Sequence, residues 1–260
     1  MSDSFIVLNT KGGVGKSTTA TLLAEMFQQR NQRWPKIAEL DEARLRSVTD
    51  LPASIETITP NVSIQEIEND PDKIAQVFGP VYDVMETEDA VIDVGANFTE
   101  RLLEWCQMSE LSHVLPSLGV RLNMVFVTTT DPQSLGTVIN DYAQAREVFG
   151  DQAGYTFVFN RARASDLERY AETNLNQRLK EAREAGTNFA YIPEMLGPLA
   201  AAAESSDRLP IDACRQSDRF LGEMNLNRAE ANRHRNRAHK WLEEVADQLG
   251  PLVDRGEPTG

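Results

Sequence analysis

The residues best suited to chemistry lie near the N-terminus, in the segment KGGVGKST that runs from Lys11 to Thr18. An apolar stretch precedes this segment and a helical pattern follows it, so it connects a strand to a helix. Its backbone N–H groups and the positive end of the helix dipole converge on a volume that suits phosphate oxygens. A lysine and a hydroxyl at its end can bind phosphates and Mg²⁺. The predicted nucleotide contacts are Gly12, Gly13, Val14, Gly15, Lys16, Ser17 and Thr18, with Lys16 also catalytic and Ser17 also a metal ligand.

The start of this segment departs from an ordinary phosphate-binding loop. The strict pattern has glycine where this chain has Thr10, and a second lysine, Lys11, follows. KGGVGKST resembles the deviant Walker A box of the ParA/MinD ATPases, a group that includes the nitrogenase iron protein. In motif order the resemblance extends to about Pro210. It implies an ATP-driven switch in which two subunits enclose two ATP molecules, with each Lys11 acting catalytically on the phosphates of the partner.

Carboxylates follow two apolar runs downstream. Asp93 lies in AVIDV, residues 90–94, which is typical of a buried parallel strand, and it resembles the Walker B aspartate that holds a water of the Mg²⁺ shell. A second predicted strand, Lys36–Leu40, contains Glu39 and is followed by Asp41. The resembled family has an Asp-x-Asp pair here that orients Mg²⁺ and the attacking water, which implies a metal-binding and catalytic role for Asp41. Glu39 departs from the pattern by one methylene. Alternatively, Glu39 and Asp41 are solvated acids of a loop without a role at the metal.

Asn160 and Pro193 are the predicted contacts to the base. Asn160 follows a predicted strand and begins the sequence Asn-Arg-Ala-Arg, whereas guanine-reading GTPases have Asn-Lys-x-Asp. The final carboxylate, which recognises the guanine amino edge, is replaced by Arg163, so the sequence favours ATP over GTP. In the resembled ATPases an asparagine at this place contacts adenine, and a turn with proline covers the base. An asparagine that only caps the strand is the alternative.

The alternation of apolar and helical patterns predicts the fold. Further strands are expected at Met124–Thr129, Tyr155–Phe159 and Phe189–Ile192, with helices from about Ser134 to Gly150 and from Ser165 to about Ala185. This order predicts a single α/β domain, residues 1–250, with a mostly parallel sheet flanked by helices on both faces. Ligands of such sheets bind at the carboxyl ends of the strands.

The predicted C-terminal helix, residues 226–249, has a basic face. Residues 228–240 include five basic side chains and one acid, Glu230, and several of the basic side chains lie opposite the apolar stripe. A solvated surface is the usual meaning of such a face; the alternative is a salt-sensitive, sequence-independent contact with DNA phosphates. The candidate DNA-binding residues are Arg228, Arg233, Arg235, Arg237 and Lys240. The acidic, proline-rich tail, residues 251–260, predicts disorder and disfavours MinD-type membrane attachment.

Composition restricts the class of protein further. The chain has 260 residues and a net charge of −14, so any attraction to DNA has to come from a local patch. Its two cysteines, Cys106 and Cys214, form no C-x-x-C pair, which argues against a disulfide framework, a zinc site or a cysteine-held cluster. No apolar leader or segment of membrane-spanning length is found. We expect a cytoplasmic protein, associated with the nucleoid if it binds DNA.

The sequence predicts an ATP- and Mg²⁺-dependent ATPase that forms a homodimer in its ATP state. Such a switch serves partition, stability or positioning of DNA, such as a plasmid, or of a related cargo complex, with slow hydrolysis stimulated by a small DNA-binding or assembly partner. The segment VIDVGANF is also similar to TraL/StbB-type ATPases of conjugative plasmids. The alternative is a nucleotide-binding adaptor with negligible turnover in a conjugation or other assembly complex.

Overall fold

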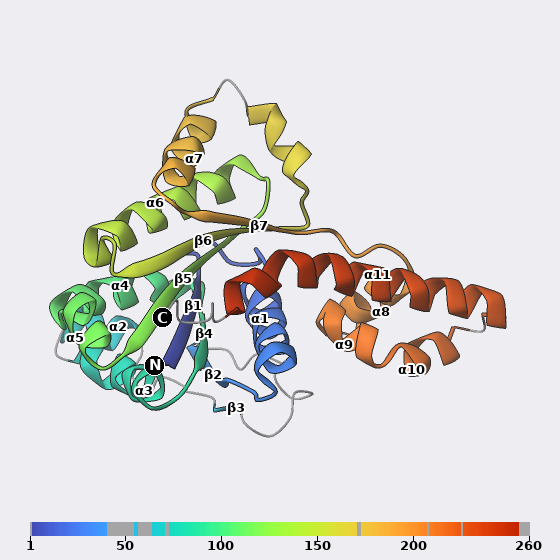
Figure 1. Cartoon of the computed structure of the whole chain (residues 1–260), viewed down its shortest axis with the longest axis horizontal. Helices are drawn as coiled ribbons and strands as arrows, with labels where there is room; N and C mark the ends of the chain where they lie inside the picture. Colours follow the sequence, from blue (N-terminus) through green and yellow to red (C-terminus); the bar gives the residue numbers. More distant parts are fainter. Residues whose placement is uncertain are drawn as a thin grey trace, which may run out of the picture.

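A parallel sheet forms the centre of the molecule. The computed structural model describes residues 2–40, 55–56, 64–70, 73–170, 173–206, 208–224 and 226–254, and Figure 1 shows their arrangement. In the described residues the sheet has seven strands, which pair in parallel in the order β3-β2-β4-β1-β5-β6-β7. The central strands are apolar runs buried on both faces, as parallel strands require. The strands are β1 (Ser2–Leu8), β2 (Lys36–Leu40), β3 (Ile55–Glu56), β4 (Ala90–Val94), β5 (Val120–Thr128), β6 (Ala153–Asn160) and β7 (Asn188–Ile192).

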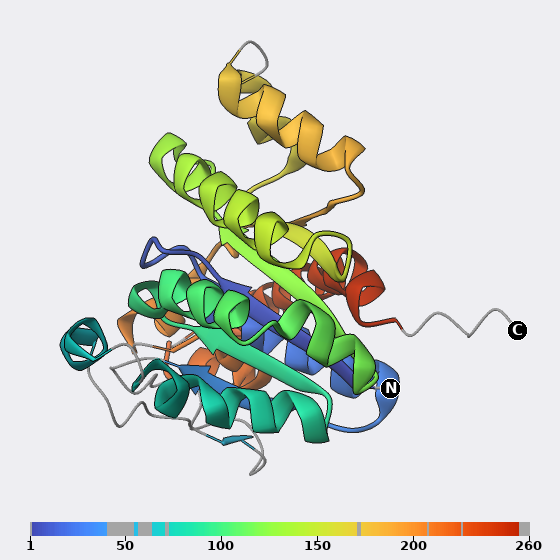
Figure 2. The same ribbon diagram turned by 90° about the vertical axis from the view of Figure 1, so that its left-hand side faces the viewer.

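Helices cover both faces of this sheet (Figure 1 and Figure 2). Alternate side chains of a strand point to opposite faces, so the sheet separates two apolar cores. One core contains α2 (Ile64–Asn69), α3 (Ile74–Thr87), α4 (Thr99–Met108), α5 (Leu111–Ser117), α6 (Pro132–Phe149) and α7 (Asn174–Glu184). The other contains α1 (Lys16–Asn31), α8 (Pro198–Ser205), α9 (Pro210–Arg215), α10 (Ser217–Gly222) and α11 (Arg228–Val253). The predicted α/β architecture is confirmed.

The order of the strands reverses at β1. After β1 the chain crosses to β2 and β3 on one side, returns to β4 beside β1, and then continues through β5, β6 and β7 on the other side. At such a reversal the connections leave neighbouring strands in opposite directions, which opens a crevice at the carboxyl ends. Asp93 of β4 lies in register with Val7 of β1. The loop that follows β1 and the carboxylate of β4 therefore meet at the edge where ligands bind in this class of sheet.

The C-terminal helix α11 packs against α1, the helix that follows the glycine-rich loop. Val245 and Leu249 of α11 are fully buried, and Arg30 of α1 forms an ion pair with Asp254 just beyond α11. The helix runs through Pro251 to Val253, so the predicted boundaries at 226 and 249 were early by two and four residues. The predicted disordered tail is helical from Pro251 to Val253, and residues 255–260 lie outside the described part. None of the helices in the described ranges is long and apolar enough to span a bilayer.

The predicted helix from Ser165 to about Ala185 is wrong in its continuity. A 3₁₀ segment, Ala164–Tyr170, comes first, and α7 begins only at Asn174. The hydroxyl of Thr173 accepts a hydrogen bond from the backbone N–H of Asn176, so this threonine caps a new helix. A local cap at Thr173 therefore begins a second helix within the stretch that is predicted to be one helix.

Candidate functional site

The glycine-rich loop connects β1 to α1 and leaves the helix N-terminus uncapped. Gly13 and Gly15 have φ of 73° and 97°, a left-handed conformation that glycine adopts without strain. Gly15 is the N-cap of α1 and makes no side-chain cap, so the first N–H groups of the helix are available to an anion. A Cβ at Gly15 would lie 2.1 Å from Nδ2 of Asn160. Position 15 therefore requires glycine, because its φ is positive and because the Asn160 side chain leaves no room for a Cβ.

Two polar residues that the sequence analysis missed hold the start of this loop. The Asn9 amide donates to the carbonyl of Val127 and its Oδ1 accepts from the Lys11 N–H, both at 2.7 Å. The buried carboxylate of Asp141, on α6, accepts the Thr10 N–H at 2.9 Å and the Thr10 hydroxyl at 3.1 Å. Thr10 replaces the glycine of the strict pattern, and its hydroxyl makes a hydrogen bond that glycine lacks. The departure from the ordinary loop is therefore built into the packing against α6.

Burial sets the protonation behaviour of Asp141. It raises the pKa of this carboxyl above the ordinary value of 3.8. The hydrogen bonds from Thr10 and the charge of Lys16 act in the opposite direction. Asp141 is thus a buried acid whose charged form depends on donors from the loop.

The two lysines of the loop occupy different surroundings. Lys16 is buried and its ammonium donates to the Lys11 carbonyl at 3.3 Å, so it lies inside the loop. The Lys11 ammonium donates to Asp131 at 2.6 Å and to Gln133 at 3.3 Å. The hydrogen bond from Lys11 is the largest cause of a lowered pKa at Asp131, which also caps α6. Lys11 is thus directed to the first turn of α6.

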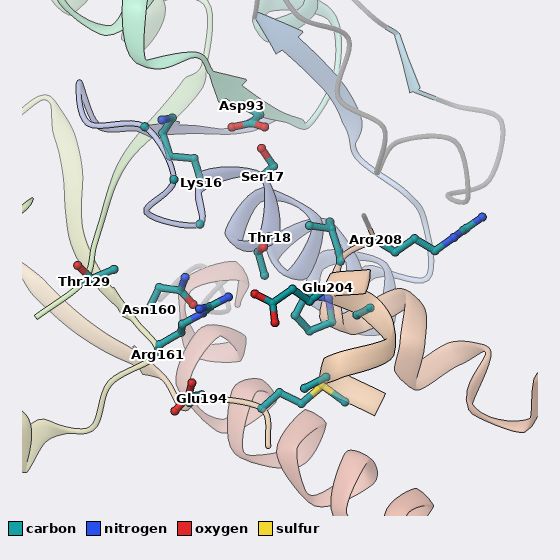
Figure 3. A pocket seen from close by; sticks show the side chains of 18 of the residues that line it. Lys16, Ser17, Thr18, Asp93, Thr129, Asn160, Arg161, Glu194, Glu204 and Arg208 are labelled. Carbon is teal, nitrogen blue, oxygen red and sulfur yellow. The ribbon is translucent and has the colours of Figure 1, made fainter. Parts of the chain in front are cut away.

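Two predicted magnesium ligands, Ser17 and Asp93, lie close together beside the loop (Figure 3). Figure 3 shows the Ser17 hydroxyl and the Asp93 carboxylate pointing toward one another. Glu39 is buried within β2 and lies in register with Asp93, rather than at the end of its strand. In the described part of the chain no three His, Cys, Asp or Glu side chains form a metal-binding group. An oxygen pair beside a phosphate site suits Mg²⁺, which usually keeps waters and phosphate oxygens as its other ligands. Asp41 lies outside the described residues.

A cavity of about 780 Å³ joins this loop to the predicted base turn. Its volume lies in the range of small-molecule sites, roughly 300–1,000 Å³. The predicted residues that line it are Gly12, Gly13, Gly15, Lys16, Ser17, Thr18, Asp93, Asn160 and Pro193. Val14 points into the core instead, and Lys11 is not among the lining residues. Lining residues that the sequence analysis did not propose as ligands include Thr129, Arg161, Glu194, Met195, Glu204, Arg208 and Trp241.

The end of the cavity that carries Asn160 and Pro193, the predicted base contacts, is held by contacts between distant segments. The Asn160 amide donates to the carbonyl of Val14 at 3.0 Å, so this side chain supports the loop. The carbonyl of Pro193 accepts a buried hydrogen bond of 2.7 Å from the indole N–H of Trp241. Trp241 belongs to α11, and the C-terminal helix therefore positions the turn that carries Pro193. Neither contact could be predicted from a local sequence pattern, because the partners lie 146 and 48 residues apart.

The five basic residues of α11 do not form one surface. Arg233, Arg237 and Lys240 are exposed and lie on one side of the helix at ~100° per residue. Arg228 and Arg235 lie on the other flank, and Arg235 forms an ion pair with Asp218 of α10. The candidate DNA-binding face is thereby reduced to three side chains.

The two cysteines lie on opposite faces of the sheet. Cys106, on α4, lies in the apolar core that contains α2 to α7. Cys214, on α9, lies in the core on the other face, which contains α1 and α8 to α11. Burial is the largest cause that raises the pKa of the Cys214 thiol, to about 12. The pair therefore cannot join in one cluster within a chain.

The parallel sheet and the glycine-rich loop between β1 and α1 define a nucleotide-binding domain of the phosphate-loop class. The chain belongs to the family whose model is described as the CobQ/CobB/MinD/ParA nucleotide binding domain, which matches residues 5–196. The resemblance to ParA/MinD-type proteins is thereby confirmed, and the TraL/StbB branch stays a prediction. No curated protein matches the sequence.

Solved structures contain related arrangements. A ParA family ATPase from Chlorobium tepidum is 15% identical, with a TM-score of 0.50 over 96% of this chain and 98% of its own, which shows a common fold. A nucleotide-binding protein from Archaeoglobus fulgidus in complex with ADP is 18% identical, with a TM-score of 0.45 over 80% and 87%. The MinC:MinD cell division protein complex from Aquifex aeolicus is 12% identical, with a TM-score of 0.45 over 94% and 96%.

Proposed function

We propose that this protein is an ATPase that binds Mg²⁺ and ATP in this cavity and dimerises while ATP is bound. The observation that carries the proposal is the different placement of the two loop lysines. Lys16 lies inside the loop, whereas Lys11 is partly exposed, bonded to Asp131, and absent from the lining of its own cavity. A second lysine in this position is available to the phosphates of another subunit. Membership in a nucleotide-binding family that includes MinD and ParA supports this assignment.

The residues of the cavity divide the work of phosphoryl transfer. The loop N–H groups and Lys16 hold the β and γ phosphates, and Ser17 and Asp93 hold Mg²⁺. The ion neutralises charge on the transferring phosphoryl group. Asp41 is assigned the role of orienting the attacking water. Lys11 exchanges Asp131 for the phosphates of the partner subunit, where its charge stabilises the transition state.

The cellular role that fits this switch is partition, stability or positioning of DNA or of a related cargo complex. Arg233, Arg237 and Lys240 form an exposed basic face on a chain whose net charge is −14, so they offer a local contact for DNA phosphates. Because α11 also carries Trp241, which bonds the turn at the base end, the DNA contact and the nucleotide share one helix. We expect a cytoplasmic protein with a small partner that stimulates hydrolysis.

Nucleotide binding and hydrolysis test the assignment separately. Lys16→Ala should lose nucleotide binding, because it removes the charge inside the loop. Asp41→Ala should keep an ATP-bound dimer that does not turn over. Hydrolysis by Asp41→Ala at the wild-type rate would show that the catalytic assignment is wrong.

A nucleotide-binding adaptor with negligible turnover is the second candidate. Glu39 favours it, because this acid departs from the family pattern and is buried within β2 beside Asp93. ATP hydrolysis measured with and without duplex DNA separates the two. The adaptor predicts no release of phosphate under either condition, and the ATPase predicts slow release that a partner or DNA accelerates.

A further inference from the structure

The cavity extends well beyond the phosphate-binding loop and carries an acid that the phosphates do not need. Glu204 lies near the end of α8 and lines the cavity. Figure 3 shows its carboxylate directed into the cavity, between Thr18 of α1 and Arg161. We propose that Glu204 binds the ribose hydroxyls of the nucleotide and makes the site prefer ribonucleotides over deoxyribonucleotides. This inference rests on the proposed nucleotide function.

The place of Glu204 along the cavity points to the sugar. Thr18 belongs to the uncapped first turn of α1, where the phosphates bind, and Asn160 and Pro193 lie at the base end. The ribose joins these two parts of a nucleotide, so it has to pass between Thr18 and Arg161. A carboxylate near phosphates is unfavourable unless hydrogen-bond donors or a positive charge lie beside it, and a bound nucleotide can supply donors. The 2′ and 3′ hydroxyls are the donors that a nucleotide presents between its phosphates and its base, and one carboxylate can accept from both.

The geometry also disfavours the magnesium ion as the partner of Glu204. Figure 3 places Ser17 and Asp93 together on one side of the loop, and Glu204 lies across the cavity from them. The two carboxylates, Asp93 and Glu204, therefore face different parts of the ligand (Figure 3).

Helix α8 places the backbone of Glu204 beside the cavity. Leu199 and Ala203 of this helix are buried in the core that contains α1 and α11. These buried side chains set where α8 lies, and Glu204 directly follows the buried Ala203. The backbone of Glu204 is thereby placed beside the cavity, and its exposed side chain reaches the cavity from there.

Diphosphates test this inference without hydrolysis or ATP-driven dimerisation. ADP, 2′-deoxy-ADP and 3′-deoxy-ADP are titrated calorimetrically against the wild type, Glu204→Gln and Glu204→Ala. A hydrogen bond to a charged group predicts that each missing hydroxyl weakens wild-type binding by about tenfold or more. Both variants should bind ADP more weakly and lose most of this preference. Glu194→Gln is the matched control, since Glu194 also lines the cavity, and it should keep the preference.

The other outcomes overturn the inference in distinguishable ways. Wild-type protein that binds ADP and the deoxy forms equally contradicts the ribose contact and leaves the nucleotide function intact. The ribose contact is also contradicted if Glu204→Ala keeps the preference. Purine riboside diphosphate lacks the amino group of adenine, and if Glu204→Gln abolishes the preference for ADP over this compound instead, the carboxylate binds the base. Failure of the wild type to bind any of these nucleotides overturns the nucleotide function itself.

Discussion

Removing the Thr10 hydroxyl isolates the feature that distinguishes this loop from an ordinary one. In Thr10→Ala the backbone bond to Asp141 remains and the hydroxyl bonds of 3.1 and 3.2 Å disappear. A hydrogen bond to a charged group contributes about 1.5–3 kcal/mol. Thr10 is only half-buried, so we expect the lower limit, a loss of about 1.5 kcal/mol in the free energy of unfolding. If the nucleotide has to reorder the loosened loop, the affinity for ADP falls by up to about tenfold.

Urea unfolding and calorimetric titration with ADP measure the two effects. Thr10→Ser keeps the hydroxyl and is the matched control, which should stay close to wild type in both assays. Combining Thr10→Ala with Asp141→Asn completes a double-mutant cycle, and contacting residues should show a coupling energy of about 0.5–3 kcal/mol. An unfolding free energy of Thr10→Ala equal to that of the wild type, or a coupling energy of zero, would show that the hydrogen bond from the Thr10 hydroxyl to Asp141 does not stabilise the loop.

Three further predictions follow from the site. Gly15→Ala should abolish ADP binding, measured by calorimetry, because the new Cβ would lie 2.1 Å from Nδ2 of Asn160. Circular dichroism should show that this variant remains folded. The raised pKa of Asp141 means that its contribution to the unfolding free energy falls as pH rises from about 3.8 through the raised value. The difference in urea stability between wild type and Asp141→Asn should show this slope, and a constant difference would contradict it. Arg233→Glu combined with Arg237→Glu should abolish ATP-dependent retention on nonspecific duplex at fixed salt, whereas Arg228→Glu, on the other flank, should not.

Local spacing was enough to predict the phosphate loop and the fold. Glycines, a lysine and a hydroxyl at fixed offsets between an apolar strand and a helix have few other uses. Buried parallel strands such as AVIDV are continuous apolar runs, and they are recognisable without knowledge of their neighbours. The sequence therefore contains the core of the site within single segments.

The supports of the site could not be predicted in the same way. Asp141 and Trp241 act through bonds to residues 131 and 48 positions away, and a single sequence contains no signal for such pairs. Asp141 lies on the mostly apolar, buried face of α6, and an acid at such a position was the available clue. For the basic helix, the sequence overestimated the size of the basic face. Counting charges along the chain gave five basic residues, but Arg228 and Arg235 lie on another flank, and Arg235 forms an ion pair with Asp218.

The oligomeric state in the presence of AMPPNP shows whether ATP drives dimerisation through Lys11. Size-exclusion chromatography with light scattering on wild type and Lys11→Ala, each with ADP or AMPPNP and Mg²⁺, compares binding with dimerisation. We expect wild type to double its mass only with AMPPNP, and Lys11→Ala to remain a monomer while its calorimetric affinity for ADP is unchanged. A wild type that stays monomeric with AMPPNP bound, or a Lys11→Ala variant that dimerises as wild type does, would contradict this expectation.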